Sequence, residues 1–362
     1  MIWIDKFISS LWNKAEKSCS ISVESSSYVR IFVGFFILLT KETSLVYWLN
    51  DFPDALYNPS ILSIGLFFSE VPNNTLLSIV DFTYSLAAIG ITLGYRTRLS
   101  SWLFIFSYFF LYSFRMSFGK VDHIILMPLV VMCFSFSNWG TVNALRVDKK
   151  SKYHSKSSAS LALLICIGMF TAGLEKAFRW IDFDLESSGF MLWFHGGFMV
   201  IGEEPLLADY IFKTPLWVFE TFDYIAPIFE LTPLLFLLSG KFWWRIWLAV
   251  ACFFHLSNTL LLSIYFIPNI MVYSVFLYCF VNKKNVWFAR NLSKIFYFLA
   301  LTLGTLHIID ITCMRLLTVS QLLPSNLIYS LSNPITPALM WLIPLTIFSI
   351  VIFKHTSLKS SH

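Results

Sequence analysis

Three charged residues close a stretch of sequence that is otherwise apolar enough to lie in a lipid bilayer. Residues 161–171 carry almost only apolar side chains, and Glu175, Lys176 and Arg179 follow them closely. A lysine at the middle of a bilayer costs roughly 2.5 to 3.5 kcal/mol, and less near the interface, so an ionisable residue here is a candidate for function. A desolvated lysine can become a neutral amine, which acts as a general base or a nucleophile. Lys176 is therefore the first candidate catalytic residue.

Helical spacing separates Lys176 from the other two charges. Gly168, Ala172 and Lys176 lie four residues apart on one stripe of a helix. Glu175 and Arg179 form an i,i+4 pair on a neighbouring face. Two interpretations stay open. In the first, the small residues allow close helix packing, and the Lys176 side chain extends to the membrane–water interface. In the second, Lys176 belongs to a functional site. Glu175 is open in the same way, because a carboxylate beside Lys176 in a dry pocket would keep the lysine charged.

The composition is that of a multi-pass membrane protein. Of the 362 residues, 57% are hydrophobic, 18% are aromatic and only 13% are charged, which excludes an ordinary soluble domain. Apolar stretches recur along the chain, and the alternation typical of membrane barrels is absent. We predict an all-α fold, a polytopic integral membrane helix bundle of about 10 transmembrane helices, within a range of roughly 8–10. The expected spans are 29–49, 75–94, 99–116, 121–138, 159–178, 215–239, 244–264, 266–281, 294–310 and 335–353.

The distribution of charge predicts the orientation of these spans. With the N-terminus in the cytoplasm, most of the 26 lysines and arginines fall on or near the cytoplasmic face, where short loops retain them. Segment 179–214, expected outside, is rich in acidic residues. The net charge of +5 thus reflects membrane topology. No soluble basic module is apparent that would bind nucleic acid.

Three regions are expected along the chain. Residues 1–28 form a cytoplasmic amphipathic segment, 29–281 form the main transmembrane domain, and 282–362 hold the C-terminal helices with a short cytoplasmic tail. Within the first region, Ile4, Phe7, Ile8 and Leu11 share one side, which favours a helix along the inner membrane surface. Segment 187–214 is expected outside, either as a cap over a cavity or as a surface loop in the headgroups.

Other polar residues fall at depths that would bring them near Lys176. Threading the chain through the membrane places them in the outer or middle parts of the second, fourth, sixth and seventh spans. We predict that they gather around one outward-facing or membrane-embedded pocket, because buried acids and bases must pair or become neutral. The alternative is that they only hold helices together as polar packing contacts. The candidates are Asp81, Asp122, His123, Glu230, His255 and Asn258.

Recognisable motifs for metal and phosphate chemistry do not accompany these residues. The six cysteines show no paired spacing, and the seven histidines are scattered. Neither a phosphate-binding loop nor a His-Glu-x-x-His pattern occurs. We therefore predict no metal site and no disulfide framework.

Short motifs follow one another in a set order between residues 28 and 281. They are Arg-Ile-Phe-Val-Gly at 30–34, Gly-Tyr-Arg-Thr-Arg at 94–98, His123, Ala-Gly-Leu-Glu-Lys at 172–176, Phe-Glu-Leu at 229–231, Phe-His-Leu-Ser-Asn at 254–258, Ile-Tyr-Phe at 264–266 and Met271. This series resembles the membrane domain of the vitamin K-dependent gamma-carboxylases and of their bacterial relatives, the HTTM (horizontally transferred transmembrane) proteins. In size and architecture the chain is similar to the B component of sporulation-delaying, or SDP-type, antimicrobial-peptide systems, which is needed to mature a secreted peptide toxin.

The resemblance implies a chemical role for Lys176. In the carboxylases, the matching lysine is the base that deprotonates reduced vitamin K, and oxygenation of that quinol yields a strong base that removes a glutamate γ-proton before carbon dioxide adds. By resemblance, Lys176 would be the base, His123 and His255 would be further residues of the catalytic pocket, and a reduced quinone would be the cofactor. Glu175 stands where the carboxylases tend to have a second lysine.

Three functions follow as hypotheses. The first is an integral-membrane enzyme of the HTTM superfamily, with gamma-carboxylase-like lyase or oxygenase chemistry, that modifies or matures a peptide on the non-cytoplasmic side. Its location would be a bacterial inner or plasma membrane, and its partners the lipid bilayer and a secreted peptide precursor. The second is a non-catalytic accessory, export or immunity component of an antimicrobial-peptide system. The third is a transporter, although no inverted repeat supports it.

Overall fold

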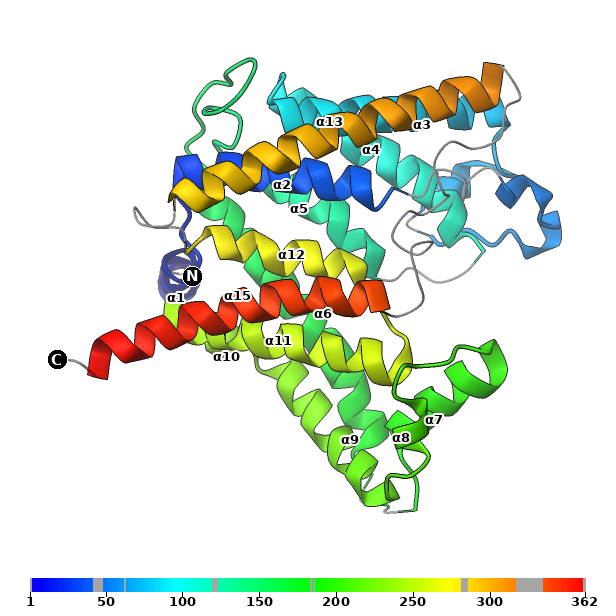
Figure 1. Cartoon of the computed structure of the whole chain (residues 1–362), viewed down its shortest axis with the longest axis vertical. Helices are drawn as coiled ribbons and strands as arrows, with labels where there is room; N and C mark the ends of the chain where they lie inside the picture. Colours follow the sequence, from blue (N-terminus) through cyan, green and yellow to red (C-terminus); the bar gives the residue numbers. More distant parts are fainter. Residues whose placement is uncertain are drawn as a thin grey trace. The chain divides into compact units, whose positions relative to one another are not determined.

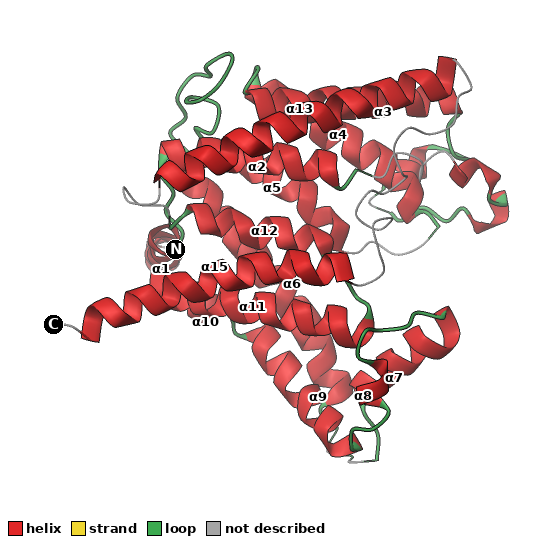
Figure 2. Ribbon diagram, in the orientation of Figure 1, coloured by secondary structure: helices red, strands yellow, loops and turns green. Residues whose placement is uncertain are grey.

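The computed structural model is built from α-helices joined by short helical turns and loops (Figures 1 and 2). It describes residues 2–41, 48–61, 63–118, 123–182, 184, 186–280, 286–316 and 335–360. No β-strand occurs in these ranges. The predicted all-α class is therefore confirmed for this part of the chain.

The chain divides into two compact units that alternate along the sequence. Unit 1 comprises Met1–Ser20, Ser158–Leu277 and Asn333–His362, and unit 2 comprises Ile21–Ser157 and Tyr278–Ser332. Each unit thus combines segments that are distant in sequence. The domain boundaries expected at residues 28 and 281 divide the chain linearly, and they stay a prediction.

Unit 1 holds helices from the beginning, the middle and the end of the chain. Within it, α11 packs against α15, α10 and α1, and α9 packs against α7 and α10. Trp341 Nε1 donates a hydrogen bond of 2.9 Å to the carbonyl oxygen of Tyr265, which ties α15 to the turn after α11. The elements are α1 (Ile2–Ser18), most of α6 (His154–Trp180), α7 (Gly189–His195), the π-helical η5 (Gly196–Ile201), α8 (Ala208–Ile211), α9 (Leu216–Leu231), α10 (Pro233–Leu238), α11 (Lys241–Leu262), α12 (Ile267–Tyr278) and α15 (Ile335–Ser360).

Unit 2 is built around α3, which packs against α4, α2 and α13. In addition, α2 packs against α13, and α4 packs against α5. The elements are α2 (Val23–Leu39), η1 (Trp48–Asp51), η2 (Asp54–Leu56), η3 (Ile64–Phe67), α3 (Asn74–Leu93), α4 (Thr97–Met116), η4 (His123–Ile125), α5 (Leu126–Ser135) and α13 (Val286–Leu316).

Arg30 of α2 holds unit 2 together at the end of α3. Its side chain is completely buried, and its guanidinium donates hydrogen bonds to the carbonyl oxygens of Ile91 (2.6 Å), Thr92 (2.5 Å) and Trp139 (3.0 Å). The last carbonyl groups of a helix lack partners inside the helix, and a cation satisfies them well. Gly94 ends α3 with φ +70°, and a Cβ atom there would lie 2.8 Å from Arg30 Nη1. Glycine thus makes room for the arginine.

Several helices have the length and composition needed to cross a membrane. In the described ranges these are Asn74–Leu93, His154–Trp180, Lys241–Leu262, Val286–Thr312 and Ile335–Lys354. A sixth is added if Asp5–Ser18 and Val23–Leu39 form one broken span. These five or six segments indicate an integral membrane protein in contact with a lipid bilayer. Each of the ten ranges expected as spans contains helix in its described part, but several of those helices are shorter, so the count of ten stays a prediction.

Proline explains why the expected span 215–239 is not one long helix. Thr232 ends α9, and Pro233 begins α10 directly after it. Because proline has no backbone N–H and its ring clashes with the preceding turn, it is favoured at a helix start and disfavoured inside one. The break leaves Glu230 in the last turn of α9.

Candidate functional site

The charged end of α6 lies in close contact with the end of α9. Gly173 is buried there, and a Cβ atom on it would lie 2.8 Å from Cβ of Glu230 and 3.1 Å from its carbonyl carbon. Small residues allow such close helix contacts in membrane proteins. The interpretation that Gly168 has this role is wrong, because Gly168 is exposed and its Cβ position has no described atom within 4 Å. Gly173, three residues before Lys176, faces the neighbouring helix instead.

Lys176 pairs with Glu230 across this contact. Its ammonium nitrogen Nζ forms an ion pair and a hydrogen bond with Glu230 Oε1. The side chain of Glu230 is only 4% exposed, whereas that of Lys176 is 24% exposed. The second carboxylate oxygen, Oε2, is buried and has no hydrogen-bond partner among the described residues. The pair therefore combines a buried carboxylate with a lysine whose side chain is partly exposed.

Glu175 does not take part in this pair. Its Oε1 lies 3.4 Å from Arg179 Nη2, and both side chains are well exposed, at 64% and 73%. The i,i+4 pair expected from the spacing is thus confirmed. An exposed pair of this kind contributes only about 0.3–0.5 kcal/mol. The carboxylate that holds Lys176 comes from another helix.

Two aromatic rings flank the ammonium group of Lys176. Its Nζ lies 5.5 Å from the ring centroid of Trp180 and 5.8 Å from that of Phe254. Aromatic faces attract a cation electrostatically within about 6 Å. Gly189, at the start of α7, lies against the Trp180 indole, and a Cβ atom there would be 2.5 Å from Cγ and 2.6 Å from Nε1. The start of α7 therefore fixes the indole in place beside Lys176.

Asp223 holds the start of α7. This fully buried residue of α9 accepts a hydrogen bond of 2.8 Å from the backbone N–H of Phe190. The Phe190 ring stacks on Phe219 of α9, with centroids 5.1 Å apart and planes 4° apart. α9 thus supplies both the anchor for α7 and, two helical turns later, the carboxylate of Glu230.

Segment 187–214 packs onto α9 and the end of α11. Its buried residues Phe190, Phe194, Ala208 and Ile211 form an apolar cluster with Phe219. The backbone N–H of Leu207 donates a hydrogen bond of 3.1 Å to the carbonyl of Leu260 at the end of α11. These contacts show that the segment packs on the helices, and whether it caps a cavity or lies as a surface loop in the headgroups stays a prediction.

His255 lies in a packed aromatic core. It is 3% exposed, and its Nε2 is 2.9 Å from the hydroxyl of Tyr273 on α12. The imidazole stacks on Trp341 of α15, with centroids 5.0 Å apart and planes 18° apart. The Tyr273 hydroxyl also donates to Met169 Sδ of α6 at 3.8 Å. His255 therefore helps to join α6, α11, α12 and α15.

The ion pair and the histidine core share two helices. On α6, Met169, Gly173 and Lys176 follow the helical spacing of one face. On α11, the adjacent residues Phe254 and His255 contact Lys176 and Tyr273 respectively. The structure thus brings Lys176, Glu230 and His255 into one region of unit 1.

The remaining predicted residues lie elsewhere. Asn258 is half-buried near the end of α11, where its carbonyl accepts from the N–H of Ile264 at 3.3 Å. Asp81 and His123 belong to unit 2, and Asp81 Oδ1 lies 2.7 Å from Lys41 Nζ. Asp122 is outside the described residues. Because the Lys176 centre forms without Asp81 and His123, a single pocket that holds all candidates stays a prediction.

Two buried acids of α9 are not among the residues predicted from the sequence. Glu220 is 3% exposed and Asp223 is completely buried, and both lie on the same buried face of the helix as Glu230. Positions 220, 223 and 230 have the spacing i, i+3 and i+10, which places them on one face of a helix. This spacing is the signal in the sequence that could have identified both acids. Both carboxylate oxygens of Glu220 lack a hydrogen-bond partner among the described residues, which is costly for a buried group.

Within the described residues, no group of three or more His, Cys, Asp or Glu side chains could hold a metal ion. Five cysteines described there, at positions 19, 133, 166, 252 and 279, are buried and form no disulfide with another described residue.

Comparisons of the chain with models of known protein families, with curated proteins and with solved structures find no match. The likeness to HTTM proteins therefore depends on the short motifs alone.

Proposed function

We propose that this protein is an integral-membrane enzyme of the HTTM type that modifies or matures a peptide, with Lys176 and Glu230 as its acid–base centre. The observation that supports the proposal most is the unequal burial of the pair, since the carboxylate side chain is enclosed while the lysine side chain is partly exposed. In the ten-span topology with a cytoplasmic N-terminus, this centre faces the non-cytoplasmic side of a bacterial membrane. That is where a secreted peptide precursor would be met.

The pair can move a proton without leaving an isolated charge. Transfer of a proton from Lys176 Nζ to Glu230 Oε1 converts an ammonium and a carboxylate into a neutral amine and a carboxylic acid. In a poorly solvated site this exchange is inexpensive, because two desolvated charges disappear together. The amine then takes a proton from an acidic group of the substrate and becomes ammonium. The substrate anion that results lies next to that ammonium group.

The residues around Lys176 fit a reduced quinone. Trp180 and Phe254 place aromatic rings beside the ammonium group of Lys176, and this group can bind a phenolate oxygen. When bound, such a quinol would supply the oxygen-derived strong base of gamma-carboxylase-like chemistry. His255 contacts Tyr273 and Trp341, so its part is to fix α11 and thereby the position of Phe254.

Variants of Lys176 test this function. Peptides and lipids are compared by mass spectrometry between cells that lack the protein and cells that express each variant. We expect Lys176→Ala to abolish the product while the protein still accumulates in the membrane. Lys176→Arg should also abolish it, because a guanidinium does not give a neutral base. The control Arg179→Gln, which alters an exposed charge on the same helix, should retain the product.

A second candidate is a non-catalytic export, immunity or accessory component that binds a peptide. It is favoured by the exposed apolar side chains on α7 and η5, among them Leu192, Met199, Val200 and Ile201. Under this function Lys176 only needs to be a cation. Full function of Lys176→Arg, with loss of function in Lys176→Ala, would therefore favour it over the enzyme.

A further inference from the structure

Within unit 1, the helix α1 packs against α10 and α11 through one face. Ala15, Ser18 and Cys19 are 0–1% exposed, and the Ser18 hydroxyl donates a hydrogen bond of 2.7 Å to the carbonyl of Leu237 on α10. These three residues follow the spacing of one helical face. Most of the other residues between Asp5 and Lys17 are exposed.

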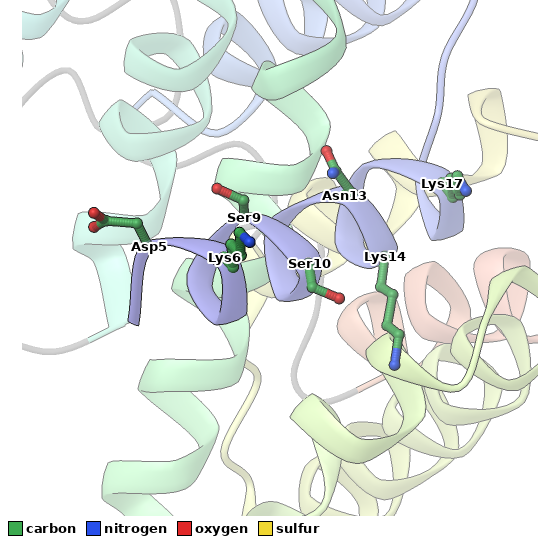
Figure 3. Close-up of a pocket in the computed structure, with 7 residues that line it drawn as sticks. All are labelled: Asp5, Lys6, Ser9, Ser10, Asn13, Lys14 and Lys17. Carbon is green, nitrogen blue, oxygen red and sulfur yellow. The ribbon is translucent and has the colours of Figure 1, made fainter. Parts of the chain in front are cut away.

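The opposite face of α1 is polar and basic. A surface hollow of about 610 Å³ runs along it (Figure 3). The side chains of three lysines, Lys6, Lys14 and Lys17, line this hollow and are exposed. Among the described residues none of the three forms an ion pair. The lining residues are Asp5, Lys6, Ser9, Ser10, Asn13, Lys14 and Lys17.

Exposed apolar side chains border the basic face. Phe7 is 51% exposed and Ile8 is 56% exposed. A helix with a lysine-rich face beside exposed apolar residues is typical of segments that lie in the membrane interface, with the apolar side in the acyl region and the lysines among the headgroups. In a chain with five candidate membrane spans, headgroups are the surface that such a helix meets.

We propose that the polar face of α1 is a binding site for the headgroups of anionic phospholipids. The three unpaired lysines supply charge opposite to that of the phosphates, and the Ser9, Ser10 and Asn13 side chains supply neutral hydrogen-bond donors between them. This site is independent of the function of Lys176. With the N-terminus in the cytoplasm, it would face the leaflet whose anionic lipids attract basic segments.

The contribution of each lysine can be stated as a change in lipid preference. A basic side chain near an anionic membrane surface favours binding by an amount that corresponds to about fivefold in the equilibrium constant. Replacing all three lysines should therefore lower the preference for anionic over zwitterionic lipid by roughly two orders of magnitude at low salt.

The test uses the full-length protein reconstituted in mixed phosphatidylcholine and phosphatidylglycerol. The ratio of the two lipids retained after mild detergent extraction is measured by mass spectrometry for the wild type and for the triple variant Lys6→Gln, Lys14→Gln and Lys17→Gln. The matched control is Lys149→Gln, Lys150→Gln and Lys152→Gln, which removes the same charge from the loop before α6. We expect the first triple variant to lose phosphatidylglycerol and the control to keep it.

Two results of the main experiment would overturn the proposal. One is an equal loss in both triple variants, which would mean that net charge and not α1 selects the lipid. The other is that inorganic phosphate displaces phosphatidylglycerol at concentrations where chloride at equal ionic strength does not, since the site would then bind a free anion. Should the triple variant fail to accumulate, each single variant is measured in the same way. An unchanged ratio in all three single variants would also contradict the proposal.

Discussion

The two units of this protein each contain a lysine paired with an acid in the company of aromatic rings. In unit 1, Lys176 pairs with Glu230, and in unit 2, Lys41 pairs with Asp81 at 2.7 Å. The ring of Tyr84 lies 5.7 Å from Lys41 Nζ, much as Trp180 lies beside Lys176. The pairs differ in access, because the lysine side chain is 24% exposed in unit 1 but 3% exposed in unit 2.

This difference teaches that a charged residue in an apolar helix is not by itself a site. Both side chains of the Lys41 pair are buried, so the pair can join helices but cannot contact a substrate without a rearrangement of the structure. In the Lys176 pair, the side chain of Glu230 is buried and that of Lys176 is partly exposed. Accessibility of one member, rather than the presence of ionisable groups, separates a candidate centre from an internal clamp. The following variants test that distinction.

The largest effect is expected from breaking the closed pair. Asp81→Asn leaves the ammonium of Lys41 buried without its counter-ion, and we expect a loss of about 3–5 kcal/mol in the free energy of unfolding. Denaturant unfolding in detergent micelles measures it. The double variant Lys41→Met with Asp81→Leu should recover most of the loss. A single-variant cost below about 1 kcal/mol would show that the pair is solvated after all.

The next largest effect is expected where α6 meets α9. Gly173→Ala would place a methyl group against the backbone of Glu230, and we expect it to cost about 1–3 kcal/mol. The matched control Gly168→Ala, on the exposed side of the same helix, should stabilise the protein by about 0.5–1 kcal/mol. Both are measured by the same unfolding assay. Equal effects at the two positions would contradict the packing described for Gly173.

A smaller effect is expected from breaking the open pair. Glu230→Gln should cost about 1–2 kcal/mol, between the values for surface and buried pairs, because Lys176 can turn toward the solvent. The same variant should abolish the proposed activity. Mass spectrometry of the product and unfolding in micelles are measured together. A stability loss as large as that of Asp81→Asn would mean that the two pairs do not differ in kind.

The smallest effect is expected at the exposed pair of α6. Glu175→Ala removes an i,i+4 contact with Arg179 and should change the free energy of unfolding by only about 0.3–0.5 kcal/mol. The proposed activity should persist, since Glu175 does not hold Lys176. Loss of the product in a variant with an unchanged free energy of unfolding would show that Glu175 takes part in the site.

Much of the fold was predictable because its signals are local. The length and composition of apolar runs predict helices such as α3, α11 and α15, and the structure contains them. The contact of Glu175 with Arg179 follows from helical spacing alone and is confirmed. Pro233 predicts the break between α9 and α10, because a proline without a backbone N–H disrupts the helical turn in which it lies.

The partners within the candidate site were less predictable. Lys176 and Glu230 were both singled out, but their pairing joins positions 54 apart in the chain and depends on how α6 meets α9. Glu220 and Asp223 were missed although their helical spacing was available. A sequence pattern states which residues share a face of one helix, and it does not state which face another helix will cover.

The sequence by itself determined that this chain is helical and built for a membrane, and that a lysine closes one of its longest apolar helices. Those properties depend on the free energy of placing each side chain in lipid and on contacts within a few residues. Only the tertiary structure decided that Gly173 rather than Gly168 faces α9, and that the counter-ion of Lys176 is Glu230 rather than Glu175. Helix packing settles such choices, because one close contact between two backbones fixes which side chains meet and which remain exposed.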